Sequence, residues 1–183
     1  MEFIKCKIEG LLLIKPDVYY DARGYFFESY NYEIFRKAGI DLNFVQDNQS
    51  QSIKNVLRGL HFQKPPYEQA KLVRVIKGTV IDVAVDIRTN SPTYGKYETQ
   101  ILSEKNNLMF YIPAGFAHGY ISLDENNIFS YKCTNYYNKQ SESAIRWNDP
   151  ILNIDWGTTV PLLSEKDANA PLFENFISPF VYI

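Results

Sequence analysis

The histidines of this chain are the first candidates for chemistry, because there are only two of them among 183 residues. His61 lies in the segment Arg58-Gly59-Leu60-His61-Phe62-Gln63, and His118 follows the turn-forming residues Pro113 and Gly115. Imidazole is the only side chain whose unperturbed pKa lies near neutrality. With the cations Arg58 and Lys71 nearby in sequence, the histidines indicate proton transfer at an anionic substrate.

The same scarcity argues against a metal centre built from histidines. A zinc or iron site needs three or more nitrogen, oxygen or sulfur ligands. The segment around His61 offers that histidine alone, because Gly59 and Gln63 occupy the positions two residues away on either side. The sequence therefore predicts no metal site, and it favours acid/base chemistry carried by side chains.

Other polar side chains complete a set that suits proton abstraction next to a carbonyl group. Such a reaction needs a base, a cation or donor that stabilises the enolate oxygen, and an acid that returns a proton on the opposite face. A carboxylate bonded to the imidazole would hold its tautomer and favour the imidazolium. The sequence offers an imidazole, a phenol, an ammonium, two carboxylates and two guanidinium groups, namely His61, Tyr131, Lys71, Asp82, Asp167, Arg23 and Arg58.

Most of these groups lie in segments with the two-residue period of β-strands. The segment 80–88 places Ile81, Val83, Val85 and Ile87 on one face and a partly charged set that includes Asp82 and Asp86 on the other. The segment 70–76 precedes it across a Lys77-Gly78 turn, which predicts a hairpin. Further strands are predicted at 25–30, 44–50, 56–62, 97–102, 108–112, 119–123 and 128–134.

Only two short helices are predicted. The first covers 32–38, with Asn31 as its N-cap and Gly39 as its C-terminal stop, and the second covers 164–169, with Ser164 as its cap. Many short strands and little helix predict an all-β antiparallel sandwich or jelly-roll barrel. The length and the absence of a linker or repeat predict one domain, residues 1–183.

The composition of the chain limits the classes of partner and the cellular compartment that we expect. A net charge of -2 and a pI of about 5.7 give no electrostatic reason to expect nucleic acid. Cys6 and Cys133 fit no metal or redox motif, which favours inert thiols in a reducing cytoplasm. The early apolar run at 11–14 is too short for a signal-peptide core or a membrane span. We therefore expect a cytoplasmic protein with no nucleic-acid or membrane partner.

Eight ordered segments carry a resemblance over nearly the whole chain. They are DARGYFFES (21–29), FVQDN (44–48), VLRGLHFQ (56–63), KLVR (71–74), DVAVDIR (82–88), IPAGFAHGY (112–120), YKCTNYY (131–137) and LSEKDA (163–168). Together they resemble the dTDP-4-dehydrorhamnose 3,5-epimerase family, whose members are metal-free cupins. The resemblance implies a cupin-type jelly-roll barrel (double-stranded β-helix) with a few short helices, and no cofactor.

The resemblance also implies a reaction and its catalytic residues. The substrate would be dTDP-4-dehydro-6-deoxy-glucose, epimerised at C3 and C5 to dTDP-4-dehydro-rhamnose in dTDP-rhamnose biosynthesis. By the match of motifs, His61 is the base, Asp167 orients it, Lys71 stabilises the enolate at the C4 oxygen, and Tyr131 is the acid on the far side. Because C3 and C5 both flank the C4 ketone, one enolate-stabilising group serves both centres.

Substrate-binding residues follow from the same resemblance. Arg23, Arg58 and Lys166 would meet the diphosphate, where guanidinium groups suit phosphate oxygens, and Tyr137 would stack on thymine. The remaining implied contacts to nucleotide and sugar are Phe26, Glu28, Gln46, Asp47, Asn48, His118 and Glu142.

The resemblance further implies a homodimer in which the N-terminal strand region pairs with the neighbour's sheet. Arg23, Phe26 and Glu28 would then serve the pocket of the other protomer. Such pairing would also cover an edge strand that otherwise invites aggregation.

Structural roles compete with several of these assignments. His118 is a candidate for a bond to backbone, and Tyr131 shares a strand face with Phe129 and Cys133, which suits core packing. Lys71 and Arg58 have solvated strand positions as their ordinary alternative. Asp82 and Asp86 are left outside the catalytic set, as structural partners of Lys71 or Arg88.

Three alternative functions stay open on sequence alone. The first two are a 3-epimerase and a 3,5-epimerase that acts on a related nucleotide-linked 4-keto sugar. The third is a catalytically silent cupin that binds a nucleotide sugar. A silent protein would have no need of His61, Tyr131 and Asp167 together, so their joint presence favours the enzyme.

Overall fold

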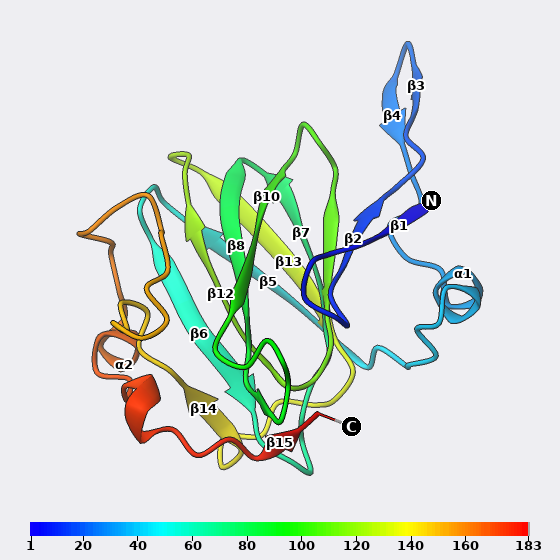
Figure 1. Cartoon of the computed structure of the whole chain (residues 1–183). Helices are drawn as coiled ribbons and strands as arrows, with labels where there is room; N and C mark the ends of the chain where they lie inside the picture. Colours follow the sequence, from blue (N-terminus) through cyan, green and yellow to red (C-terminus); the bar gives the residue numbers. More distant parts are fainter. Residues whose placement is uncertain (183) are drawn as a thin grey trace.

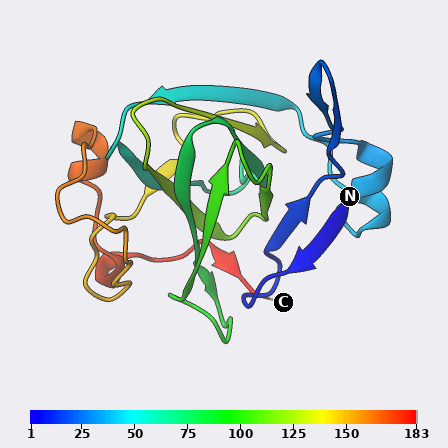
Figure 2. The same cartoon turned by 90° about the horizontal axis from the view of Figure 1, so that it is seen from above.

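Two antiparallel β-sheets face each other in this protein, whose computed structural model describes residues 1–182 (Figures 1 and 2). The first sheet contains, in spatial order, β1 (Glu2–Lys5), β2 (Leu12–Lys15), β11 (Met109–Ile112), β7 (Lys71–Lys77), β13 (Asn127–Cys133) and β5 (Gln46–Ser52). The second contains β10 (Tyr97–Ser103), β8 (Thr79–Asp86), β12 (Phe116–Ser122), β6 (Leu57–Gln63) and β14 (Glu142–Ala144). The predicted all-β antiparallel barrel is confirmed.

Two small strand pairs lie outside these sheets. β3 (Tyr19–Asp21) and β4 (Gly24–Phe26) form a hairpin that projects from the body of the molecule (Figure 1). β15 (Phe180–Val181) runs parallel to β9 (Arg88–Thr89) and fastens the C-terminal segment to the barrel.

The predicted helices are confirmed at their caps. In α1 (Tyr32–Lys37), the Asn31 side chain accepts hydrogen bonds from the backbone N–H groups of Glu33 and Ile34. In α2 (Glu165–Ala168), Ser164 accepts one from the N–H of Asp167. A single 3-10 turn, η1 (Phe173–Asn175), was not predicted. Among residues 1–182, no helix is long and apolar enough to cross a membrane.

The predicted hairpin of 70–76 with 80–88 is wrong, because β7 and β8 do not pair but lie in different sheets. The other strand predictions failed where pairing is short or irregular. The strand predicted at 25–30 ends at Phe26, since the chain turns there toward α1, and β12 begins three residues before the predicted 119. β1, β2, β3, β14 and β15 were not predicted at all. They have two to four residues each, so their pairing depends on tertiary contacts rather than on a sequence period.

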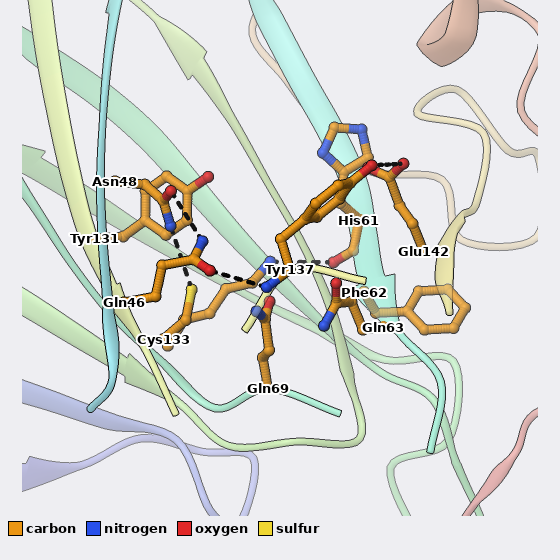
Figure 3. A pocket seen from close by; sticks show the side chains of 11 residues that line it. Gln46, Asn48, His61, Phe62, Gln63, Gln69, Tyr131, Cys133, Tyr137 and Glu142 are labelled. Atoms are coloured by element: carbon orange, nitrogen blue, oxygen red, sulfur yellow. Dashed lines mark hydrogen bonds between the residues drawn. The ribbon is translucent and has the colours of Figure 1, made fainter. Parts of the chain in front are cut away.

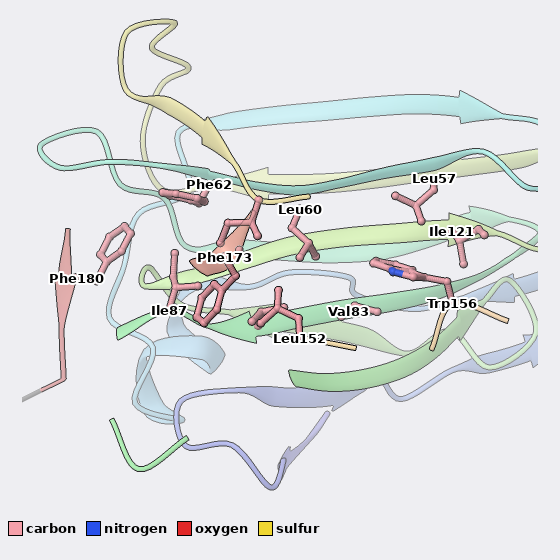
Figure 4. Close-up of a cluster of buried hydrophobic side chains, with 13 residues drawn as sticks. Leu57, Leu60, Phe62, Val83, Ile87, Ile121, Leu152, Trp156, Phe173 and Phe180 are labelled. Atoms are coloured by element: carbon pink, nitrogen blue, oxygen red, sulfur yellow. The ribbon is translucent and has the colours of Figure 1, made fainter. Parts of the chain in front are cut away.

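Three layers of apolar side chains hold the sheets in place. One lies between the sheets and includes Val73, Ala84, Phe110 and Phe129. A second covers the outer face of the five-stranded sheet, where C-terminal residues such as Trp156 and Phe173 pack on Leu60 and Val83 (Figure 4). In the third, α1 packs Phe35 on the outer face of the six-stranded sheet, as shown by its cluster with Ile14, Leu72 and Met109.

This layering explains the two faces of β8. Ile81, Val83 and Val85 belong to the outer cluster, as does Ile87 just after the strand, whereas Val80 and Ala84 belong to the cluster between the sheets. Because side chains alternate along a strand, the partly charged face, with Asp82 and Asp86, points into the barrel. Both carboxylates are completely buried there.

A β-bulge in β6 places two functional residues on the same side. His118 of β12 pairs with His61, but Tyr120, two residues later, pairs with Arg58, three residues earlier. In a regular strand, residues three apart point to opposite faces, whereas the extra residue in β6 turns both toward one cavity. Gly59 lies at this irregularity with φ of 142°, and a Cβ there would lie 2.5 Å from the Cα of Gly119. The close approach of β6 and β12 therefore requires glycine.

Candidate active site

A cavity of about 300 Å³ opens between the two sheets, and three of the four predicted catalytic residues line it (Figure 3). His61, Lys71 and Tyr131 all line it, and they come from β6, β7 and β13. The other lining residues are Gln46, Asn48, Phe62, Gln63, Gln69, Cys133, Tyr137 and Glu142.

His61 is bonded to a buried carboxylate. Its Nε2 lies 2.5 Å from Oδ1 of Asp167, while 31% of the His61 side chain is exposed and only 4% of that of Asp167. Burial acts to raise the pKa of Asp167, but its bond to His61 and the His61 charge outweigh this effect and lower that pKa, with help from Ser164 and Lys166. Asp167 is thus held as a carboxylate. It occupies Nε2, so Nδ1 is the nitrogen that can accept a proton from a ligand.

Tyr131 lies across the cavity from His61, because the two residues come from opposite sheets (Figure 3). It shares its strand face with Phe129 and Cys133, as predicted, and its ring is 6.1 Å from that of Phe129. Burial raises the pKa of Tyr131 to about 12, so the phenol keeps its proton near neutrality. Its geometry suits a proton donor facing a base.

Lys71 lines the same cavity, with its Nζ 3.5 Å from the backbone oxygen of His61. Burial lowers the pKa of Lys71, because removing an ammonium from water disfavours its charged form. The charges of Cys133, Asp82 and Glu142 act in the opposite direction. An ammonium in such a place can stabilise a negative oxygen strongly, because little water screens it.

The rim of the cavity carries a chain of polar contacts. The Tyr137 hydroxyl donates to Oε2 of Glu142 at 3.1 Å, and Nζ of Lys166 lies 2.5 Å from Oε1 of the same carboxylate. Burial acts to raise the pKa of Glu142, but Lys166 and Tyr137 outweigh it and lower that pKa. Tyr137 is exposed and lines the cavity, and its ring offers a surface on which a flat base can stack.

A second cavity of about 430 Å³ shares His61 with the first as a lining residue. Arg58, Lys166 and Asp167 line it together with His61. Arg58 is exposed, and its guanidinium donates to Oγ of Ser52 at 3.2 Å. Two cations beside one cavity suit a phosphorylated ligand, and the binding of a diphosphate by Arg58 and Lys166 stays a prediction.

The structure brings only two of the three consecutive residues 46–48 into the site. Gln46 and Asn48 line the cavity, whereas Asp47 points outward and forms an ion pair of 2.9 Å with Lys132. Alternation along β5 is the reason, since neighbouring side chains leave a strand on opposite faces.

His118 does not line either of these cavities. It is buried on β12, opposite His61 in the pairing with β6, and its Nε2 lies 2.9 Å from Oδ2 of Asp82. The predicted alternative, a bond from His118 to backbone, is wrong, because its partner is a carboxylate. Asp82, which the sequence interpretation left out of the catalytic set, therefore belongs to the surroundings of the site.

The hairpin residues lie away from both cavities. Arg23, whose side chain is 90% exposed, forms an ion pair with Asp21, and Phe26 is 70% exposed. Glu28 accepts a hydrogen bond of 3.2 Å from Asn31. Within one chain these three residues line neither cavity at His61.

Gln63 is a site residue that the sequence interpretation missed. Its amide donates to the backbone oxygens of Tyr67 and Tyr136, at 2.6 and 3.1 Å, and accepts from the N–H of Asn138 at 2.7 Å. It therefore fixes both sides of Tyr137. Gln63 ends the strand that carries His61, and this position was the available signal for a role in the site. Two of its three partners lie more than 70 residues away, so a local sequence pattern cannot reveal them.

Of residues 1–182, none form a group of three or more His, Cys, Asp or Glu side chains that could hold a metal ion. The donor groups around His61 are instead arranged as pairs, with one carboxylate for each imidazole.

Comparison with known proteins places this site in a family. Residues 5–175 match the family model described as dTDP-4-dehydrorhamnose 3,5-epimerase. The enzyme of that name from Salmonella typhimurium is 51% identical over 176 residues, covering 95% of this chain and 96% of the relative. The one from Methanothermobacter thermautotrophicus is 49% identical over 177 residues, covering 94% and 95%.

Solved structures agree with the sequence relatives. The crystal structure of the 3,5-epimerase from Legionella pneumophila, in complex with dTDP-4-keto-L-rhamnose, superposes with a TM-score of 0.95 at 45% identity. The match covers 100% of this chain and 98% of that one, which confirms the predicted cupin-type fold. On both grounds, the chain belongs to the dTDP-4-dehydrorhamnose 3,5-epimerase family.

Proposed function

We propose that this enzyme inverts C3 and C5 of dTDP-4-dehydro-6-deoxy-glucose with His61 as the base, Lys71 as the enolate-stabilising cation and Tyr131 as the acid. The activity itself, that of a dTDP-4-dehydrorhamnose 3,5-epimerase in dTDP-rhamnose biosynthesis, follows from membership of the family. The observation that carries the residue roles is the joint placement of His61 and Tyr131 on facing sheets around one cavity.

The first half of the reaction is a proton transfer to His61. Nδ1 removes the proton on C3 or C5, and the electron pair of that C–H bond moves into the ring to form an enolate on the C4 oxygen. The imidazolium that results keeps its Nε2 proton on Asp167, whose carboxylate stabilises it. The Lys71 ammonium faces the negative oxygen.

The second half returns a proton from the opposite side. The Tyr131 hydroxyl protonates the carbon on the face away from His61, the C4 carbonyl re-forms, and the configuration is inverted. Exchange with solvent then removes the proton from His61 and restores the one on Tyr131. Because both carbons flank the same ketone, a small rotation of the sugar suffices for the same groups to act on the second centre.

Substrate orientation is proposed from the polar residues around the two cavities. Tyr137 stacks on thymine, Gln46 and Asn48 contact the nucleotide, and Arg58 and Lys166 meet the diphosphate beside His61. Glu142, which bonds both Tyr137 and Lys166, ties these two regions together.

We also propose that two protomers, each a single cupin-like domain, assemble through the hairpin β3–β4. The hairpin exposes Tyr19, Tyr20, Tyr25 and Phe26 by 56% to 71% each, which is costly for a free surface. Docked on a partner, it would bring Arg23, Phe26 and Glu28 to the pocket of the other protomer. Cys6 and Cys133 are both free thiols, which supports a location in a reducing compartment such as the cytoplasm.

Deuterium incorporation in heavy water tests the reaction. The substrate is incubated with the protein, and label at C3 and C5 is followed by NMR. Label at both carbons supports the 3,5-epimerase, and label at C3 alone would show a 3-epimerase instead. If neither carbon gains label, the protein is a silent nucleotide-sugar binder and the proposal fails.

A further inference from the structure

Arg58 is an exposed cation that two neutral oxygens hold in place. Its Nε donates to Oγ of Ser52 at 3.2 Å, and its Nη2 donates to the backbone oxygen of Gln51 at 3.3 Å. Among residues 1–182 no carboxylate forms an ion pair with Arg58, whereas Arg88 has Asp86 at 2.8 Å. A guanidinium has five N–H groups, so three of those of Arg58 stay free for a ligand.

This way of holding Arg58 suits an anionic ligand. A carboxylate partner would offset its charge and would occupy the N–H groups that a phosphate needs. A hydroxyl and a carbonyl oxygen fix the side chain and leave the charge uncompensated. A long side chain that is already held also loses less conformational entropy when a ligand binds. The two contacts therefore prepare Arg58 for binding an anion.

Ser52 is the fixed member of this pair. It ends β5, is only 5% exposed and pairs through its backbone with Asn127 of β13. The Asn127 side chain is completely buried, donates to the backbone oxygen of Ser52 at 3.4 Å and accepts from the N–H of Thr79 at 2.9 Å. Because β5 and β6 belong to different sheets, the bond from Arg58 to Ser52 fixes a residue of one sheet against the other.

We propose that Ser52 is a positioning residue, which holds the Arg58 guanidinium in place for the diphosphate of the substrate. This inference rests on the proposed function, in which Arg58 meets the diphosphate. Arg58 and His61 line the same cavity of about 430 Å³, so the orientation of the guanidinium affects how the substrate lies beside the base. Ser52 lines neither cavity at His61, so it acts through Arg58.

The test is the binding of dTDP to Ser52→Ala, measured by isothermal titration calorimetry, together with the kinetics of the full substrate. The variant loses one acceptor and keeps the bond from Arg58 to Gln51. We expect the Kd of dTDP and the KM of the substrate to rise about 3- to 10-fold, because binding must now order the arginine side chain. We expect kcat to change by less than about 2-fold, since the bound diphosphate orders Arg58 in its turn. Wild-type values of Kd and KM would overturn the proposal.

Ser50→Ala is the matched control. Ser50 lies two residues earlier on the same face of β5, and its Oγ is 2.8 Å from the hydroxyl of Tyr120 on the opposite sheet. That hydroxyl is 3.5 Å from Oγ of Ser52, too far for a strong hydrogen bond. Ser50→Ala thus also removes a hydroxyl that bridges the sheets, but it should leave dTDP binding unchanged. Equal weakening in both serine variants would show a general effect on the barrel and would contradict the role of Ser52.

Arg58→Ala shows whether Ser52 acts through Arg58. In that background Ser52→Ala should weaken dTDP binding no further, because the group that Ser52 holds is gone. A second loss as large as in the wild-type background would overturn the proposal.

The same variants separate this inference from the proposed function. Wild-type dTDP binding by Arg58→Ala would defeat the proposed diphosphate contact, and the role of Ser52 with it. Weak binding by Arg58→Ala with wild-type binding by Ser52→Ala would defeat only the role of Ser52. The binding of dTDP needs no turnover, so deuterium incorporation by the wild-type enzyme tests the proposed reaction independently.

Discussion

Two histidine–aspartate pairs have their histidines on neighbouring strands, and the two imidazoles differ in their access to solvent. His61 and His118 are paired in register between β6 and β12. The His61 side chain is 31% exposed and lines both cavities, whereas that of His118 is 8% exposed and lines neither. A base must reach its substrate, so only His61 fits that role.

The role of Tyr131 leads to a prediction that separates exchange from inversion. In Tyr131→Phe, His61 still removes the proton and can return one from solvent to the same face. We expect inversion to fall about 100-fold or more, and deuterium exchange into recovered substrate to fall much less. NMR of both pools measures the two rates. Equal losses of exchange and inversion would contradict the assignment of Tyr131 as the acid.

At the residue scale, much of the site could be predicted, but its partners could not. The roles of His61, Lys71, Tyr131 and Asp167 came from a family resemblance, since His61 and Asp167 are 106 residues apart and no local period joins them. The outward position of Asp47, by contrast, could have been predicted from the sequence. Its place on the outward face follows from strand alternation between Gln46 and Asn48, a signal that was present in the sequence.

At the element scale, the geometry of the site depends on the bulge between β6 and β12. The sequence predicted both strands, but not the extra residue that turns Arg58 and His61 to one side. Bulges arise from cross-strand packing, here the contact of Gly59 with Gly119, which a single-strand pattern does not contain.

Gly59→Ala should therefore damage both stability and catalysis. Its φ of 142° disfavours a side chain, and the new Cβ would meet backbone at 2.5 Å, so we expect a loss of roughly 2–4 kcal/mol in the free energy of unfolding. Gly39→Ala is the control, since it has a positive φ but open space and should cost about 1 kcal/mol. Urea unfolding measures both. Similar losses in the two variants would argue against the close contact.

The ion pair at the end of β8 predicts a pH-dependent contribution to stability. Burial acts to raise the pKa of Asp86, but Arg88, Ser91 and Thr93 outweigh it and lower that pKa. Its contribution is therefore present above the unfolded value of about 3.9 and is lost as the pH falls through the lower folded value.

Asp86→Asn should lose about 3 kcal/mol of unfolding free energy at pH 7, because Arg88 is left without its partner. The difference from wild type should shrink below about pH 4. Urea unfolding at pH 7 and at pH 3 checks this. A difference that stays constant between the two pH values would show that the Asp86 charge contributes nothing.

At the scale of the whole molecule, the barrel was predictable from the strand pattern, whereas the dimer was expected only from the family resemblance. Alternating strands and few helices indicated the two-sheet architecture, because burial of one strand face requires a second layer. The two outer apolar layers were not foreseen, since the segments that cover the outer faces of the sheets, around α1 and after residue 144, carry little periodic signal.

The exposed hairpin β3–β4 predicts that assembly and activity are lost together. In Tyr25→Ser/Phe26→Ser, we expect a monomer by light scattering, an unchanged circular dichroism spectrum and activity reduced at least about 10-fold. Ile177→Ser, at an apolar side chain that is 91% exposed elsewhere, should leave both properties unchanged. A double variant that remains dimeric, or a wild type that is monomeric and active, would rule out the proposed role of the hairpin.

One base for two centres is the central claim, and deuterium incorporation by His61→Asn tests it most directly. Asparagine can donate to Asp167 but has no nitrogen that accepts a proton near neutrality. We expect a folded protein in which labelling at C3 and at C5 falls together, by at least about 100-fold relative to wild type. Continued labelling of either carbon at the wild-type rate would show that a different group removes that proton.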